Sequence, residues 1–158
     1  MRPWSQVMTD QEVTMQPDEI DWNIINLLRE SHQNNNAIAR QLGISEGTVR
    51  QRLKKLKESS IIKIKALINP EVLANQQLAT IAVNVSESSL LESKAKELSD
   101  LPNVLGVSIT SGRYDLFVEV LVDSNRGLVH FLTEELAGVR GVSSTESFLM
   151  LKSFNKYV

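Results

Sequence analysis

The sequence has 158 residues, of which 42% are hydrophobic and 23% are charged. This composition supports a packed core and excludes an intrinsically disordered chain. There is no cysteine, which excludes disulfides and thiolate metal sites, and no apolar stretch approaches the roughly 20 residues that span a bilayer. No basic segment followed by an apolar one opens the chain, so we predict no signal peptide and expect a cytoplasmic protein.

The net charge of −2 conceals an uneven distribution along the chain. Residues 46–65 hold seven basic and two acidic residues, whereas residues 66–158 hold seven basic and eleven acidic ones. A basic patch in an otherwise acidic chain is typical of a module that binds a polyanion such as a nucleic acid. A solvated amphipathic helix would carry the same charges, so the spacing of the small and apolar residues has to separate the two interpretations.

The chain opens with residues 1–17, which show no hydrophobic periodicity and are predicted to form an N-terminal tail. The first helix is predicted to begin at Asp18, a suitable N-cap, with Asp21 as its capping-box partner three residues on. The apolar residues that follow fall on one stripe of a helix: Ile20, Ile24, Leu27 and Leu28.

Residues 34–57 have the pattern of a helix-turn-helix. Asn34 is a candidate cap for a short helix that we expect to end at about Leu42. Ala39 is small where this helix would cross the next one, and Gly43 allows the positive φ of a tight turn between them.

The next helix, predicted over residues 46–59, has the features of a DNA recognition helix. Ser45 is a good N-cap for it. Its apolar face is formed by Val49, Leu53 and Leu56. A basic helix of this kind lies in the major groove with its first turn nearest the base edges. Gly47 has no side chain and would let the helix approach the groove closely.

The residues left to face outward are the predicted DNA-binding residues: Ser45, Glu46, Thr48, Arg50, Gln51, Arg52, Lys54 and Lys55. Those near the helix start are placed to read bases, and the basic residues further along are placed to neutralise phosphates. For each basic residue, a phosphate contact is more common than base readout.

Residues 61–68 alternate imperfectly and predict an extended segment, either a small wing or a connector. Asn69–Pro70 breaks this segment. We therefore assign a helix-turn-helix domain to residues 18–64, a linker to 65–76 and a second domain to 77–158.

The second domain has the predicted order β-α-β-β-α-β. Strands are predicted over residues 78–85, 104–110, 114–122 and 142–151. The first helix is predicted to open on a capping box of Ser89 with Glu92, and the second on Asp123 or Ser124. The fold class is thus α+β, a winged helix-turn-helix followed by a ferredoxin-like domain. Two helices would cover one sheet face, and apolar residues on the other face predict a second subunit there.

Three motifs in this order and spacing carry a resemblance to a known family. They are GISEGTVRQRLKKLKESSII in the helix-turn-helix, SGRYDLFVEV at the third strand and GVSSTESF at the fourth. Over residues 18–152 the chain resembles the Lrp/AsnC family of transcription regulators, the leucine-responsive type. This resemblance implies a ligand-sensing second domain, a homodimer that assembles into tetramers or octamers, and a small effector, commonly an amino acid.

The resemblance also implies an effector site. Gly112, Arg113, Tyr114 and Asp115 match the G-x-[YF]-D hairpin of the family, and Thr145 and Ser147 match two polar positions on the last strand. An amino acid needs N–H donors for its carboxylate and an acceptor for its ammonium group, which the Gly112 backbone and Asp115 would supply. In the alternative interpretation Gly112 only makes the turn, and Asp115 and Thr145 satisfy local backbone groups.

Other functions have less support in the sequence. Some proteins of similar architecture decarboxylate tetrapyrroles, but this chain has only two histidines and no nucleophile elbow, phosphate loop or metal-ligand spacing. We therefore predict no catalytic residue, no metal and no cofactor. Binding to RNA would require a stacking platform, and only 5% of the residues are aromatic. A metabolite sensor without specific DNA recognition is disfavoured by the basic helix.

The sequence thus predicts a non-enzymatic regulator that binds double-stranded DNA in a sequence-specific manner and makes no membrane contact. The resemblance implies that its DNA binding or assembly responds to a small effector, expected to be an amino acid. The alternative in the same class is an architectural DNA-binding protein that works without an effector.

Overall fold

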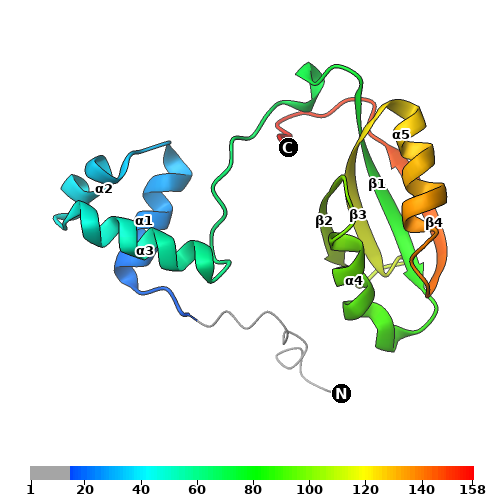
Figure 1. Cartoon of the computed structure of the whole chain (residues 1–158), viewed down its shortest axis with the longest axis horizontal. Helices are drawn as coiled ribbons and strands as arrows, with labels where there is room; N and C mark the ends of the chain where they lie inside the picture. The colour runs from blue at the N-terminus through cyan, green and yellow to red at the C-terminus, as the bar shows by residue number, and fades with distance from the viewer. Residues whose placement is uncertain (1–14) are drawn as a thin grey trace. The chain divides into compact units, whose positions relative to one another are not determined.

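The computed structural model describes residues 15–158, shown in Figure 1. Residues 1–14, which make up most of the predicted tail, lie outside the described residues. The chain divides into two compact units, Met1–Lys65 and Ala66–Val158, and each is described separately. Among the described residues, no helix is both long enough and apolar enough to cross a membrane.

The first unit contains three helices, α1 (Glu19–Glu30), α2 (Asn35–Leu42) and α3 (Glu46–Glu58). Each begins at its predicted N-cap. Asp18 and Asp21 form the predicted capping box, each accepting a hydrogen bond from the backbone N–H of the other. Asn34 and Ser45 cap α2 and α3 through their side-chain oxygens.

The turn between α2 and α3 depends on Gly43, which has a φ of 65° as predicted. The N–H of Ile44 donates to the carbonyl of Ala39 across this turn. Buried side chains from all three helices then close the small core: Ile24, Ile38, Ala39, Val49 and Leu53. The apolar residues of α3 thus face inward, and its other side is left to solvent.

The segment after α3 has no regular secondary structure from residue 62 to residue 69. It begins as part of the first unit, because Ile62 packs against the core and its N–H donates to the carbonyl of Leu56. Of the two predicted alternatives, a wing or a connector, the absence of a strand in residues 62–69 favours a connector.

The second unit is a four-stranded antiparallel sheet with helices on one face. Its main elements are β1 (Gln76–Val85), α4 (Leu91–Ser99), β2 (Val104–Ile109), β3 (Leu116–Asp123), α5 (Ser124–His130), the π-helical turn η4 (Phe131–Leu136) and β4 (Val142–Leu149). Two short 3₁₀ turns, η2 (Pro70–Val72) and η3 (Ser88–Leu90), precede β1 and α4. The strand order β2-β3-β1-β4 confirms the predicted ferredoxin-like topology.

Alternate side chains of the two central strands form the core of this unit. Ala79, Ile81 and Val83 of β1 lie beside Leu116, Val118 and Val120 of β3 in one buried cluster. Leu98 of α4 and Phe131 of η4 join the same cluster, so the helices cover this face of the sheet (Figure 1). The opposite face carries the intervening residues of each strand.

The predicted capping box of Ser89 and Glu92 is wrong. Residues 88–90 form η3, α4 begins only at Leu91, and no side chain caps it. The Leu90 N–H instead donates to the carbonyl of Glu87, so a backbone turn replaces the side-chain cap. Asp123 occupies the predicted N-cap position of α5, but its side chain makes no capping hydrogen bond.

Gly43→Ala should lower the free energy of unfolding of the first unit by about 1 kcal/mol, because a side chain at a φ of 65° is strained. Gly47→Ala is the matched control. Gly47 lies inside α3, where a Cβ would meet only the Ser45 Oγ at 3.7 Å, so alanine should raise stability by up to about 1 kcal/mol. Urea unfolding of both variants measures the difference, and equal losses would contradict this explanation of the turn.

Candidate functional site

The outward side of α3 is a basic surface. Five of the predicted DNA-binding residues are exposed: Ser45, Arg50, Gln51, Lys54 and Lys55. The other three are partly buried: Glu46, Thr48 and Arg52. Because Val49, Leu53 and Leu56 are buried, this helix can rotate little without exposing its apolar face.

Ser45 and Thr48, at the start of α3, form hydrogen bonds with each other. The Ser45 Oγ accepts from the Thr48 N–H at 3.1 Å and lies 2.8 Å from the Thr48 Oγ1. These contacts occupy the hydroxyls in capping the helix. Gln51, one turn further along, presents an exposed side-chain amide, which is a group that reads adenine in the major groove.

The cations of this surface are weakly restrained. Arg50 pairs with Glu46 at 2.5 Å, but the Arg50 side chain is 70% exposed. Lys54 lies 3.7 Å from Glu58, again at the surface. Exposed pairs of this kind contribute little to stability, so a DNA phosphate can replace the carboxylate. Among the described residues, Lys55 makes no ion pair.

Arg52 is only partly exposed and makes ion pairs with carboxylates at the start of α1, which were not predicted from the sequence. Its Nη1 lies 2.8 Å and 2.7 Å from the two carboxylate oxygens of Asp18 and 2.8 Å from the Oδ1 of Asp21. Arg52 lowers the pKa of the Asp18 carboxyl, and the hydrogen bonds to Asp18 and Asp21 raise the pKa of Arg52. Helical periodicity within α3 could not show this contact, because its partners are the N-cap and the first turn of α1, 34 and 31 residues away.

In the second unit, the hairpin between β2 and β3 holds four of the predicted effector-binding residues. A Cβ on Gly112 would have no neighbour within 4 Å, and its φ is not in the left-handed region. Neither the turn nor local packing therefore requires glycine there. The Arg113 guanidinium lies 5.4 Å from the centre of the Tyr114 ring, and this ring packs edge-on against Phe117.

Asp115 has a clear structural partner. Its Oδ2 accepts from the Val85 N–H at 2.9 Å, where the pairing of β1 with β4 shifts register. Its own N–H donates to the carbonyl of Val83 at 3.1 Å. One carboxylate oxygen thus satisfies a backbone group that the irregular ladder would leave unpaired. Within the described part of the chain, the other oxygen has no hydrogen-bond partner.

Glu146, which was not predicted, contacts this hairpin. We call Gly112, Arg113, Tyr114, Asp115 and Glu146 the hairpin cluster. The Tyr114 hydroxyl donates to the Glu146 carboxylate, which raises the pKa of Tyr114. Glu146 pairs with Ala82 of β1, and Ala82 in turn pairs with Phe117 of β3. Strand alternation within GVSSTESF could have identified it, because Glu146 points to the face opposite its two neighbours.

Thr145 and Ser147 lie on the other side of β4. They pair with Val83 and Ile81, whose side chains belong to the helix-covered core. Thr145 lines a shallow groove of about 230 Å³ beside η4, next to Leu136 and Val142. The Tyr114 hydroxyl thus reaches the sheet face opposite the helices, whereas Thr145 and Ser147 lie on the helix-covered face.

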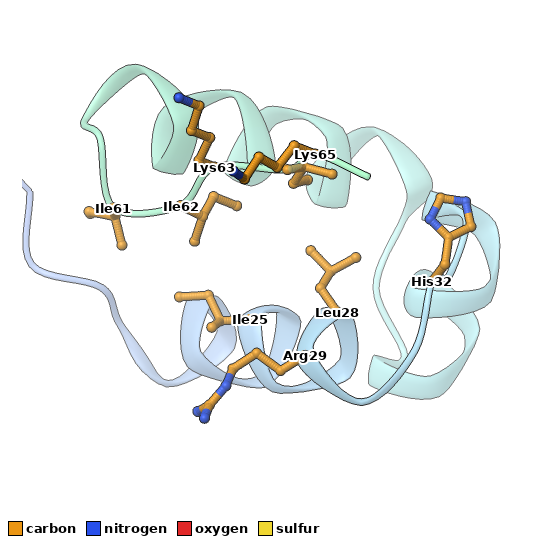
Figure 2. A pocket seen from close by; sticks show the side chains of 9 residues that line it. Ile25, Leu28, Arg29, His32, Ile61, Ile62, Lys63 and Lys65 are labelled. Atoms are coloured by element: carbon orange, nitrogen blue, oxygen red, sulfur yellow. The ribbon is translucent and has the colours of Figure 1, made fainter. Parts of the chain in front are cut away.

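One cavity of the first unit contains none of the predicted site residues. It has a volume of about 440 Å³ and lies between α1 and the segment after α3. Figure 2 shows Ile25, Leu28 and Ile62 pointing into this space, whereas Arg29 points away from it. The cavity is thus lined by apolar side chains together with His32, Lys63 and Lys65.

Comparison with known proteins identifies the family. Residues 78–157 match the model of the Lrp/AsnC ligand binding domain, and residues 17–63 match that of a winged helix-turn-helix DNA-binding domain. The chain belongs to the Lrp/AsnC family. It is a DNA-binding transcriptional regulator with a ligand-binding domain, as predicted from the motifs.

Relatives of this Lrp/AsnC chain match it over most of its length. An uncharacterized HTH-type transcriptional regulator of Pyrococcus furiosus is 38% identical, covering 84% of this chain and 90% of its own. The transcriptional regulator FL11 of Pyrococcus horikoshii is 33% identical, covering 86% and 90%. The structure of a Neisseria meningitidis regulator in complex with L-Met has a TM-score of 0.66 at 23% identity, covering 90% and 94%.

Lys54→Ala should weaken binding to all duplex sequences about equally, because Lys54 is an exposed cation that can neutralise a phosphate. The slope of log affinity against log salt should decrease by about 0.9. Fluorescence anisotropy over a salt series measures this slope. Lys96→Ala, on α4 of the second unit, is the control, and an unchanged slope for Lys54→Ala would reject its phosphate contact.

Proposed function

We propose that this regulator binds specific DNA sequences through α3 and that an effector with the chemistry of an amino acid controls its DNA binding or its assembly. The observation that carries the first half is the outward basic surface of α3. Gln51 supplies an amide for base edges there, and Arg50, Lys54 and Lys55 supply charge for phosphates. Gly47 leaves the backbone of the first turn open to close approach.

A homodimer would present two such helices to one duplex. Two helices related by a two-fold axis contact half-sites about 34 Å apart or a multiple of that distance. The sheet face opposite the helices supports a dimer, because Phe148 and Leu105 remain exposed in the single chain. If dimers assemble further, DNA following several of them would bend, at an elastic cost of a few kcal/mol offset by additional contacts.

The hairpin cluster is the proposed effector site. The exposed backbone at Gly112 and the Arg113 guanidinium offer donors for a carboxylate. The second oxygen of Asp115 and the carboxylate of Glu146 offer acceptors for an ammonium group. The L-Met complex of the Neisseria regulator supports an amino acid as the class of ligand. Such a ligand acts only if its affinity differs between two assemblies or conformations.

One observation favours a second candidate, an architectural protein without an effector. Tyr114 and Asp115 already have partners within the chain, in Glu146 and the Val85 N–H. Catalysis has no comparable support. The described residues contain no group of three or more His, Cys, Asp or Glu side chains able to hold a metal.

The effector proposal is tested with Asp115→Asn. Asparagine keeps an acceptor for the Val85 N–H but removes the negative charge, so the fold should remain and the effector response should be lost. Light scattering on a sizing column, with and without a panel of amino acids, first identifies the responding ligand on the unmodified protein.

Two further variants separate structure from recognition. Asp115→Ala should also destabilise the second unit by about 1–3 kcal/mol, because the partly buried Val85 N–H loses its acceptor. Thr145→Ala, on the opposite side of the sheet, should respond normally. A full response in Asp115→Asn would place the ammonium site elsewhere, and no response in the unmodified protein to any amino acid would favour the architectural candidate.

A further inference from the structure

The contact of Arg52 with Asp18 and Asp21 links the recognition helix to the start of α1. We propose that Arg52 is a positioning residue for DNA readout, which fixes the rotation of α3 and does not itself contact a phosphate. This inference rests on the DNA-binding function proposed above.

The acceptors of this contact are held rigidly. Asp18 and Asp21 exchange hydrogen bonds with each other's backbone N–H groups, at 2.9 Å and 3.1 Å, and so fix the first turn of α1. The Nη1 of Arg52 then lies within 2.8 Å of three oxygens from these two side chains. Asp21 is only 1% exposed, so its carboxylate depends on Arg52 as a charged partner.

Local charge argues against a phosphate contact by Arg52. Two carboxylates surround one guanidinium, so the three groups together carry a net charge of −1 and offer no attraction to a polyanion. The Asp18 side chain is 54% exposed and lines the same hollow of about 280 Å³ as Thr48, Gln51 and Lys55. A phosphate approaching Arg52 there would meet Asp18 as well.

The position of Arg52, between α3 and the start of α1, explains how its contact can orient the recognition helix. The burial of Val49, Leu53 and Leu56 limits the rotation of α3 to a narrow range, but apolar packing is not directional and does not set the angle within that range. A charged hydrogen bond to fixed acceptors is directional and selects one angle within it. Gln51 is the neighbour of Arg52 in sequence and lines the same hollow, so this rotation sets where the Gln51 amide points.

The test uses the full chain and an operator chosen by selecting from a random duplex pool with the unmodified protein. Arg52→Gln combined with Asp21→Asn exchanges the buried ion pair for a neutral hydrogen-bonding pair and leaves the local net charge at −1. Affinities for the operator and for a random duplex are measured over a salt series. Thermal unfolding establishes that each variant is folded at the assay temperature.

A positioning role predicts that operator affinity decreases by about tenfold or more, the loss expected for one misplaced base contact, while random-duplex affinity and the salt slope stay unchanged. Arg52→Lys keeps one charged nitrogen near the two carboxylates and should recover part of the discrimination. Lys54→Ala serves as the phosphate-contact reference, with weaker binding to both duplexes and a smaller slope.

Three results would overturn the proposal. A slope reduced by about 0.9 in the double variant, with equal loss on both duplexes, would make Arg52 a phosphate contact. A lower melting temperature with an unchanged ratio of operator to random affinity would make its role purely structural. If the unmodified protein selects no sequence while still binding duplex DNA, sequence readout itself fails and there is nothing for Arg52 to position.

Discussion

The burial of one face of α3 is the constraint on which the DNA-binding unit depends. Val49 and Leu56 have no exposed surface and Leu53 has 7%, so the helix must turn this face toward α1 and α2. Fully burying such side chains stabilises a small domain by about 1.5–3 kcal/mol each. The charged residues of the same helix are thereby left outward, and a packing requirement creates the surface that we propose for DNA binding.

The second unit uses strand alternation in the same way. Inward residues of β1 and β3 pack under the helices, and the intervening residues form a face that carries Phe117, Glu146 and Phe148. The Tyr114 hydroxyl crosses from the hairpin to Glu146, so the proposed effector site is held by two chain segments on either side of β1. A ligand there would contact both segments and could change the face that we propose for the dimer.

Local patterns predicted much of this structure, and long-range contacts account for what they missed. The caps at Asp18, Asn34 and Ser45 and the φ of Gly43 depend on residues within a few positions, and all four were predicted. The strand order followed from the β-α-β-β-α-β pattern. In contrast, the contacts of Arg52 with Asp18 and Asp21 were not predicted, because these partners are more than 30 residues away. Glu146 was missed because its partner Tyr114 lies in the hairpin before β3, 32 residues away, and the Ser89 cap failed because a backbone turn fulfilled the same requirement.

The central claim is that α3 reads the major groove, and methylation interference on a selected duplex tests it most directly. Methylation at N7 of guanine blocks the major groove, and methylation at N3 of adenine blocks the minor groove. We predict that N7 methylation prevents binding in two segments about 34 Å apart, or a multiple of that, as expected for two recognition helices. Interference by N3 methylation alone, or by neither modification, would contradict the account.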